Sequence, residues 1–379
     1  MRIERRLTTP RWLALAVPVA SLVAAFAASS VVLLAAGKDP IAIYLRLFDR
    51  AFFASGALTS TFVTATPLLL TGLAAAAAFR MRLWNIGGEG QLYLGAVGAS
   101  GVGLVLRDQS GIVIIAGMIL GGLFSGAAWA VIPGLLRAYF NTNEIITTLM
   151  LNYVASLLLS YLIFDSQSFW RELSTFSARA FPQGKVLPDA AMWPSFNIGI
   201  AIVPFGLVVG IAVAALWWLF YGSTSFGFKA RVLGDSPSAA RYAGIQTRRV
   251  VVAMMALSGA LAGLGGASEI GDFRHVLDPR GLQQAGLGYA GIVVAALARY
   301  NPYAVVVVAV LLGGLANAGY SLQGPDFPAG LVGVLQGMIL FFALGGELLL
   351  RYRVTFGARR AAPPRALSIA AGPAGVSGP

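Results

Sequence analysis

The 379-residue sequence has no cysteine, one histidine and few charged side chains, which together make up 11% of the chain. Without cysteine, the chain forms no disulfide bond and no thiolate metal site. The single histidine, His275, falls in a loop between apolar segments, so neither a histidine-based triad nor a zinc site with two histidines is available. Paired carboxylates at metal-binding spacing are also missing from the apolar segments, which argues against a membrane-embedded enzyme.

A nucleotide-binding loop is missing as well. The two Gly-Lys pairs, Gly37-Lys38 and Gly184-Lys185, have no glycine five residues earlier and no Ser or Thr after the lysine. Residues 286–291 match the GxGxxG pattern, but no strand precedes them and they begin an apolar segment. The sequence therefore predicts neither ATP hydrolysis by this chain nor a dinucleotide-binding fold.

Apolar residues dominate the composition. They make up 58% of the chain, and the mean hydropathy is +0.77, well above the values of soluble domains. The longest stretch without a candidate span, 165–196, is shorter than the ~50 residues of a small domain. A single polytopic membrane domain is predicted, and the net charge of +12 is attributed to cytoplasmic loops rather than to nucleic-acid binding.

Windows of about 20 apolar residues predict an all-α protein with about ten transmembrane helices. Ten spans place both termini on one side, and 18 of the 27 Lys and Arg residues then fall on that side, which makes it cytoplasmic. The first apolar run is too long for a cleaved signal peptide, so it counts as a span. The predicted spans are 12–36, 57–79, 86–106, 111–136, 144–164, 197–221, 250–271, 286–299, 302–320 and 329–350.

These spans divide the chain into a cytoplasmic N-terminus (1–11), a transmembrane domain (12–350) and a disordered cytoplasmic tail (351–379). The loop 165–196 is predicted to be extracytoplasmic and the loop 222–249 cytoplasmic. The eighth span is short and runs directly into the ninth, so a broken or re-entrant pair is expected there. Glycines repeated at four-residue spacing, such as Gly122/Gly126 and Gly259/Gly263, predict close helix packing.

One polar stretch, FRMRLWNIGGEGQLYL at residues 79–94, interrupts the apolar run from 57 to 106. Glu89 lies within this stretch, near the start of the span 86–106, and Glu144 lies at the start of the span 144–164. Both positions suit either structural capping or a role in a path or gate. Glu89 is predicted to pair with Arg80 or Arg82. Glu269, near the outer end of its span, is a candidate gate residue.

Neutral polar side chains in the spans suit the recognition of uncharged solutes by hydroxyl and amide hydrogen bonds. Each of them suits interhelical hydrogen bonding equally well. The candidates for a substrate path, including the two carboxylates, are Asn85, Glu89, Gln91, Asn143, Glu144, Asn152 and Tyr153.

The loop 222–249 contains a predicted short helix, with Ser236 as N-cap, Pro237 as first residue and Gly244 as stop. A helix of about seven residues is unstable alone in water, so it is expected to dock, with Ala240 on its packed face. A purely topogenic role, with the basic residues meeting lipid headgroups, is the alternative. The residues predicted to matter are Lys229, Arg231, Asp235, Ser236, Pro237, Ala240, Arg241, Tyr242, Gly244, Arg248 and Arg249.

The polar stretch resembles the FNIG-EGQ signature of permease subunits of bacterial ABC importers for nucleosides and simple sugars, relatives of the branched-chain amino acid permeases. Further segments agree in order: NEIITTLMLNYVA (143–155), GFKARVLGDSPSAARYAGI (227–245), SGALAGLGGASEI (258–270) and GLGYAGIVVAALARYNP (286–302). The resemblance covers most of the chain between residues 60 and 320.

This resemblance implies a complex in the bacterial inner membrane with a second permease subunit, identical or not, two cytoplasmic ATPases that bind ATP and magnesium, and an extracytoplasmic binding protein. The short loop helix would insert into a groove of the ATPase. This chain itself would hold no cofactor and contact lipid, and would carry a nucleoside or a simple sugar. The alternatives are a secondary transporter or channel for a small polar solute, which needs no partner, and a membrane-integral enzyme, which needs a catalytic cluster.

Overall fold

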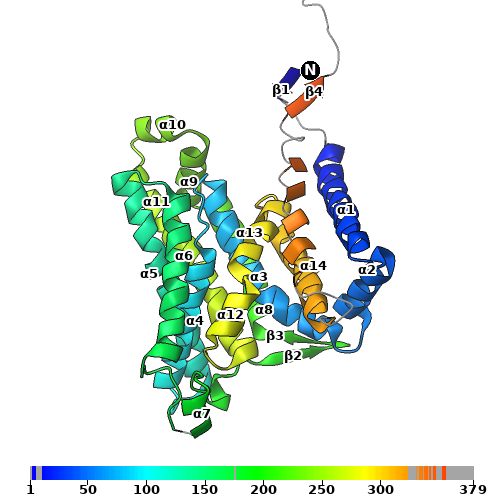
Figure 1. The fold of residues 1–379 in the computed structure, drawn as a ribbon. Coiled ribbons are helices and arrows are strands. Elements are labelled where there is room, and N and C mark those ends of the chain that lie inside the picture. Colours follow the sequence, from blue (N-terminus) through cyan, green and yellow to red (C-terminus); the bar gives the residue numbers. More distant parts are fainter. Residues whose placement is uncertain are drawn as a thin grey trace, which may run out of the picture.

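The structure is a computed structural model that describes residues 2–5, 11–174 and 176–322. From residue 330 onward it describes only short pieces, namely 330, 333–335, 337–339, 341–342, 345–346 and 352–355. Most of the predicted tenth span (329–350) and of the tail (351–379) therefore lies outside the described residues. The described chain is mainly helical (Figure 1). Within the described residues, six helices are long and apolar enough to cross a membrane: Ala57–Arg80, Gly111–Phe140, Glu144–Asp165, Phe205–Ser223, Thr247–Arg274 and Pro302–Ser321.

The elements run in the following order, with π-helical or 3-10 turns labelled η. The N-terminal half contains β1 (Arg2–Arg5), α1 (Arg11–Ala35), α2 (Pro40–Phe48), η1 (Asp49–Phe53), α3 (Ala57–Arg80), α4 (Gly88–Val105), α5 (Gly111–Phe140), α6 (Glu144–Ser160), η2 (Tyr161–Asp165), α7 (Phe176–Ala180) and η3 (Asp189–Ala191). The remainder contains β2 (Ser195–Ile198), β3 (Ala201–Pro204), α8 (Phe205–Ser223), α9 (Ser225–Asp235), α10 (Pro237–Tyr242), α11 (Thr247–Ser268), η4 (Glu269–Arg274), α12 (Pro279–Ala285), α13 (Leu287–Leu297), α14 (Pro302–Ser321) and β4 (Tyr352–Thr355).

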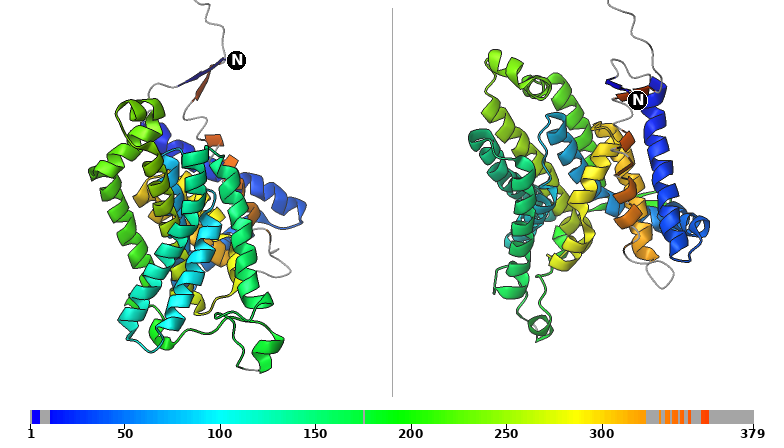
Figure 2. Two further views of the ribbon diagram at one scale, coloured as in Figure 1. Left: turned by 90° about the vertical axis from the view of Figure 1, so that its left-hand side faces the viewer. Right: turned by 45° about the horizontal axis from the view of Figure 1, so that its top comes forward.

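The helices form a bundle with α10 at one end and α7 at the other (Figures 1 and 2), and these ends are called the α10 end and the α7 end. Strands β1 and β4 pair antiparallel beyond the α10 end, which brings the N-terminal residues next to residues 352–355. The first predicted span coincides with α1, whose apolar part is Val19–Ala35.

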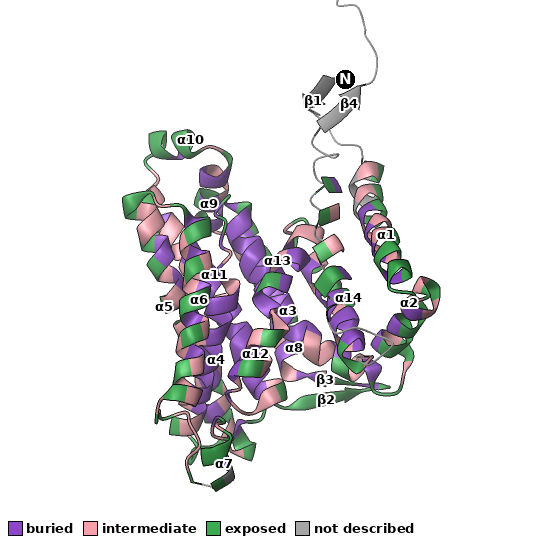
Figure 3. Ribbon diagram, in the orientation of Figure 1, coloured by how far each residue is buried: buried purple, intermediate pink, exposed green. Residues whose placement is uncertain are grey.

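Helix α3 lies at the centre of the bundle. In its most apolar window 83% of the residues are buried, against 22% in α5 and in α6, whose outer faces are exposed (Figure 3). Helix α11 packs on α3, α4 and α5. Its contact with α5 depends on the repeated glycines, because a Cβ on Gly126 would collide with the carbonyl oxygen of Gly259, and one on Gly263 with that of Gly122. The predicted close packing of these glycines is confirmed.

The start of the predicted span 197–221 is wrong. Residues 195–204 form an antiparallel hairpin, β2 and β3, and α8 begins only at Phe205. The sequence SFNIGIAIVP alternates β-branched residues with small ones, and Gly199 supplies the positive φ of +60° that the turn requires. Hydropathy alone does not separate such a strand pair from a helix, and the prediction of an entirely α-helical chain missed both pairs of strands.

The broken pair predicted for the spans 286–299 and 302–320 is present as α13 and α14, and a further break precedes it at Gly286. Helix α12 ends at Gly286, which is left-handed with φ +57°, and α13 continues for 11 residues from Leu287. The chain then turns through Arg299 and Tyr300, both left-handed, and Pro302 begins α14. Two short helices in place of one span leave a free helix N-terminus inside the bundle.

Candidate functional site

Two helix N-termini meet inside the bundle, those of α4 and α13. A Cβ on Gly288 would collide with the backbone of Gly88 and Glu89, so only glycine allows this approach. Helix α13 runs from this point toward the α10 end and, with 11 residues, is about 16 Å long, or about half of a ~30 Å hydrocarbon core. The two N-termini therefore meet near half depth.

The Glu89 side chain lies between these N-termini and is 1% exposed. One carboxylate oxygen accepts hydrogen bonds from the backbone N–H groups of Gly288 (2.6 Å) and Tyr289 (3.1 Å), and the other accepts one from the Tyr93 hydroxyl (2.7 Å). Glu89 thus caps α13 from another helix. The positive ends of two helix dipoles favour its charge.

The predicted ion pair of Glu89 with Arg80 or Arg82 is therefore wrong. Arg80 is the last residue of α3, and its guanidinium lies 4.7 Å from the ring centroid of Tyr221. The arginines stay at the α10 end while the chain descends to half depth before α4 begins. Residues 81–87, which make this descent, are called the re-entrant segment.

A reciprocal pair of amide hydrogen bonds holds the re-entrant segment to α4. Asn85 Nδ2 donates to Gln91 Oε1, and Gln91 Nε2 donates to Asn85 Oδ1, both over 3.0 Å. Asn85 Nδ2 also donates to Ser258 Oγ of α11, which in turn donates to the carbonyl of Ala74 in α3. The side chains of Asn85, Gln91 and Ser258 are buried, so the network has a low-dielectric environment in which its bonds are strong.

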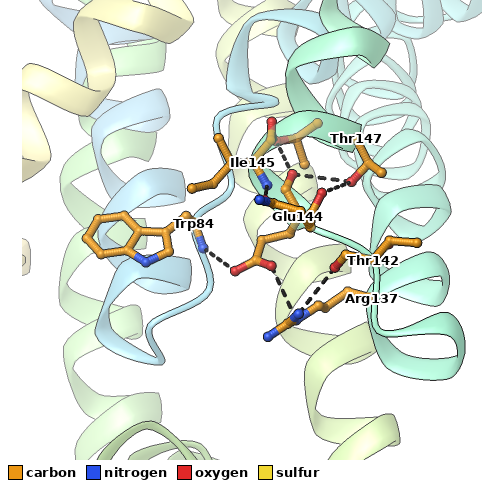
Figure 4. Close-up of polar contacts among 8 residues, drawn as sticks. Trp84, Arg137, Thr142, Glu144, Ile145 and Thr147 are labelled. Atoms are coloured by element: carbon orange, nitrogen blue, oxygen red, sulfur yellow. Dashed lines mark hydrogen bonds and ion pairs between the residues drawn. The ribbon is translucent and has the colours of Figure 1, made fainter.

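One face of α6 binds the other side of the re-entrant segment through residues spaced four apart. Glu144 accepts from the N–H of Trp84 and pairs with Arg137 at 3.2 Å (Figure 4). Thr148 accepts from the N–H of Ile86. Asn152 accepts from the N–H of Gly90, and it donates to the carbonyl of Ile86 and to the Tyr289 hydroxyl. The backbone groups that the segment leaves unpaired are thereby satisfied, as a membrane interior requires.

The predicted path residues thus fall into two groups. Asn85, Glu89, Gln91, Glu144 and Asn152 are buried and hydrogen-bonded within the chain, the arrangement expected of interhelical contacts. The other two are exposed: Asn143 caps α6 by accepting from the N–H of Ile145, and Tyr153 is 60% exposed on α6. The substrate-path role of all seven remains a prediction.

A cavity of about 550 Å³ lies between α3, η4, α12 and α14 and is called the outer cavity. Glu269 lines it and is paired with Arg274 at 2.8 Å, and Arg274 also contacts Asp278. Most other polar lining residues are neutral, and the sequence reasoning did not select them. They are Thr59, Ser60, Thr64, Gln284, Asn317 and Tyr320.

A signal for these residues was present in the sequence. Thr59, Ser60 and Thr64 are hydroxyl residues in the first turns of an apolar helix, and Asn317 is an amide inside α14. In the described residues, Gln284 has no hydrogen-bond partner, and the Asn317 amide nitrogen has only a long 3.5 Å contact with Thr61. The amide groups of Gln284 and Asn317 therefore retain hydrogen-bonding capacity on the cavity side. The part of the chain that is described contains no group of three or more His, Asp and Glu side chains able to hold a metal ion.

The predicted loop helix forms as α10. Ser236 accepts from the N–H of Ala239, Pro237 is the first residue, and Gly244 has a φ of +71°. The N–H of Ile245 donates to the carbonyl of Ala240, which completes a glycine-based helix end. The predicted N-cap, first residue and stop are therefore confirmed.

The predicted role of the Ala240 side chain needs correction. Ala240 is 0% exposed within this single chain, so it packs on its own protein and is not available to a partner. Tyr242 is 97% exposed instead. Lys229, Asp235 and Arg241 are also exposed, whereas Arg231 lies over the Tyr221 ring and donates to the Tyr221 carbonyl.

The fold and this site define a class, a multi-pass helical membrane transport protein with a re-entrant, hydrogen-bonded segment and a polar cavity. The chain belongs to the family described as branched-chain amino acid transport system / permease component, whose model matches residues 57–344. It is therefore a transport subunit and not an enzyme, as predicted.

Among similar proteins, the glucose ABC transporter permease protein TsgB13 of Haloferax volcanii is 33% identical, with 93% of both chains covered. The guanosine ABC transporter permease protein NupP of Bacillus subtilis is 30% identical over 86% of this chain and 92% of its own. The nucleoside ABC transporter permease protein NupB of Lactococcus lactis subsp. cremoris is 30% identical over 86% and 89%. No solved structure gives a significant match. The predicted resemblance to nucleoside and sugar ABC permeases is confirmed.

Proposed function

We propose that this chain is the membrane subunit of an ATP-driven importer that carries a nucleoside or a simple sugar. The outer cavity carries the proposal, because hydroxyl and amide groups suit a neutral polyhydroxylated solute. Its volume of about 550 Å³ lies within the ~300–1,000 Å³ of small-molecule sites. The relatives that act on glucose, guanosine and nucleosides support the same solute class.

The subunit lies in the inner membrane of a bacterial cell, and its α10 end faces the cytoplasm. The excess of Lys and Arg in the segments assigned to this side supports this orientation. The pairing of β1 with β4 beyond the α10 end supports a common side for both ends of the described chain. The α7 end then faces a binding protein that delivers the solute.

The partners are a homologous permease subunit, two ATPases that hold ATP and magnesium, the binding protein and lipid, and no nucleic acid. Helix α10 is the contact with an ATPase. It has six residues, too few for stability alone, and presents Tyr242 to the outside while Ala240 fixes it to its own chain. Movement of this loop would reach the re-entrant segment, because Gly234 of α9 lies against Met81.

The test is reconstitution in proteoliposomes with a panel of radiolabelled nucleosides and sugars. We expect uptake only when ATPases, a binding protein and ATP are all present. A carboxylate and a broken helix near half depth are also features of secondary transporters. Accumulation driven by an ion gradient in liposomes that contain this chain alone would therefore overturn the importer proposal.

A further inference from the structure

A second cavity, at the α10 end, is lined by four arginines from four parts of the chain. Its volume is about 280 Å³, slightly below the ~300 Å³ at which drug-sized ligand sites begin. Arg82 comes from the re-entrant segment, Arg137 from α5, Arg241 from α10 and Arg248 from α11. This cavity is called the arginine pocket.

Among the described residues, carboxylates balance little of the positive charge of the pocket. Arg137 is paired with Glu144. No carboxylate forms an ion pair with Arg82, Arg241 or Arg248 in the ranges that the structure describes. The N-terminal turn of α11 also faces the pocket through Thr247, and its N-cap residue makes no side-chain cap bond. Three unpaired guanidinium groups and a positive helix end favour an anionic occupant.

The chemistry of the lining residues indicates which anion the pocket binds. Guanidinium groups match the oxygens of a phosphate in a two-pronged geometry that no ammonium reproduces. Beside the pocket, the last turn of α5 carries Tyr139 and Phe140, which are 55% and 76% exposed. Exposed aromatic residues at the end of a membrane helix lie at the headgroup level. The pocket thus opens beside the layer in which lipid phosphates lie.

We propose that the arginine pocket binds the phosphate of an anionic phospholipid headgroup from the leaflet at the α10 end, which is the inner leaflet in the orientation proposed above. The bound phosphate joins the re-entrant segment, through Arg82, to the loop that carries α10, through Arg241, and to the start of α11. Arg248 is already oriented by its contact with Tyr139, 5.2 Å from the ring centroid. The lipid is therefore a structural link between the loop and the re-entrant segment.

The experiment is native mass spectrometry of the purified full-length chain with added phosphatidylglycerol or phosphatidylcholine. The test variant is the double substitution Arg82→Gln/Arg248→Gln. The control variant, Lys229→Gln/Arg249→Gln, removes the same charge from exposed residues of the loop that do not line the pocket. We expect the wild type to prefer phosphatidylglycerol. The test variant should bind it about tenfold or more weakly, as expected for the loss of charge-assisted hydrogen bonds, and the control should match the wild type.

Two further measurements separate a lipid site from other outcomes. Arg248→Lys keeps the charge but loses the planar fork, so it should bind between the wild type and the test variant, and far-UV circular dichroism checks that each variant is folded. Equal phosphatidylglycerol binding by the test and control variants would overturn the proposal. Release of phosphatidylglycerol from the wild type by inorganic phosphate would assign the pocket to a soluble phosphate and overturn the lipid as its occupant.

Discussion

The carboxylate of Glu89 accepts a hydrogen bond from the backbone N–H of Gly288 over 2.6 Å, although the two residues are 199 positions apart in the sequence. The bond joins two helices that begin at the same point, α4 and α13. One acidic side chain thereby satisfies the end of a helix that begins at half depth, where no water is available to do so.

Two substitutions of Glu89 distinguish the contribution of its charge to stability from the contribution of its hydrogen bonds. Glu89→Gln retains an oxygen for the two N–H groups but removes the charge facing two helix ends, at a cost of up to about 2 kcal/mol. Glu89→Leu leaves two N–H groups and a hydroxyl without a partner, at ~1–3 kcal/mol each. We expect the thermal stability of the purified chain, followed by tryptophan fluorescence, to fall in the order wild type, Gln, Leu. A Leu variant as stable as the wild type would refute the capping role.

Gly288→Ala should destabilise the chain because the added methyl group meets the backbone of Gly88 and Glu89, which cannot rotate away as a side chain can. The matched control is Gly222→Ala, at the end of α8, where a Cβ meets nothing within 4 Å. The yield of monodisperse protein after size-exclusion chromatography measures the difference. Similar yields of the two variants would show that α4 and α13 do not approach so closely.

Hydropathy predicted the long helices, because α3, α5, α11, α14 and the continuous helix of α6 and η2 each reach the length of about 20 apolar residues that a bilayer requires. It failed where the apolar signal is shared by two conformations, as in the hairpin before α8. The local caps were also predictable: Ser236, Pro237 and Gly244 act within a few residues of each other.

The partners of the polar residues were not predictable, because they depend on contacts between distant segments. Nothing near Glu89 in the sequence indicates that α13 begins beside it, and two arginines only seven and nine residues earlier were the obvious alternative. The burial of Ala240 and the lining of the outer cavity could not be predicted for the same reason, because both depend on contacts between distant segments. A local pattern identifies a polar residue in a span, but only the packing decides what it faces.

The exposed aromatic on α10 provides a test of ATPase binding. Tyr242→Ala should weaken association with the ATPase by about 2 kcal/mol, or roughly thirtyfold, if it is an interface hot spot. Phe176→Ala, which removes an aromatic that is 88% exposed at the α7 end, is the control. Co-purification of the ATPase with each membrane-inserted variant gives the answer, and equal recovery with both variants would contradict docking through α10.

Two tyrosines of α14 provide the sharpest test of the outer cavity. Tyr320 lines the cavity, whereas Tyr303 packs against Trp218 with ring centroids 5.8 Å apart, and the two are similarly exposed at 53% and 49%. Tyr320→Phe removes one hydroxyl from the cavity and should raise the KM for ATP-driven uptake about two- to tenfold, the value of one hydrogen bond to a neutral ligand. Tyr303→Phe should leave KM unchanged. Because the same change is made on the same helix, a KM increase confined to Tyr320→Phe would follow from contact with the solute, and equal KM values for the two variants would exclude Tyr320 from the path.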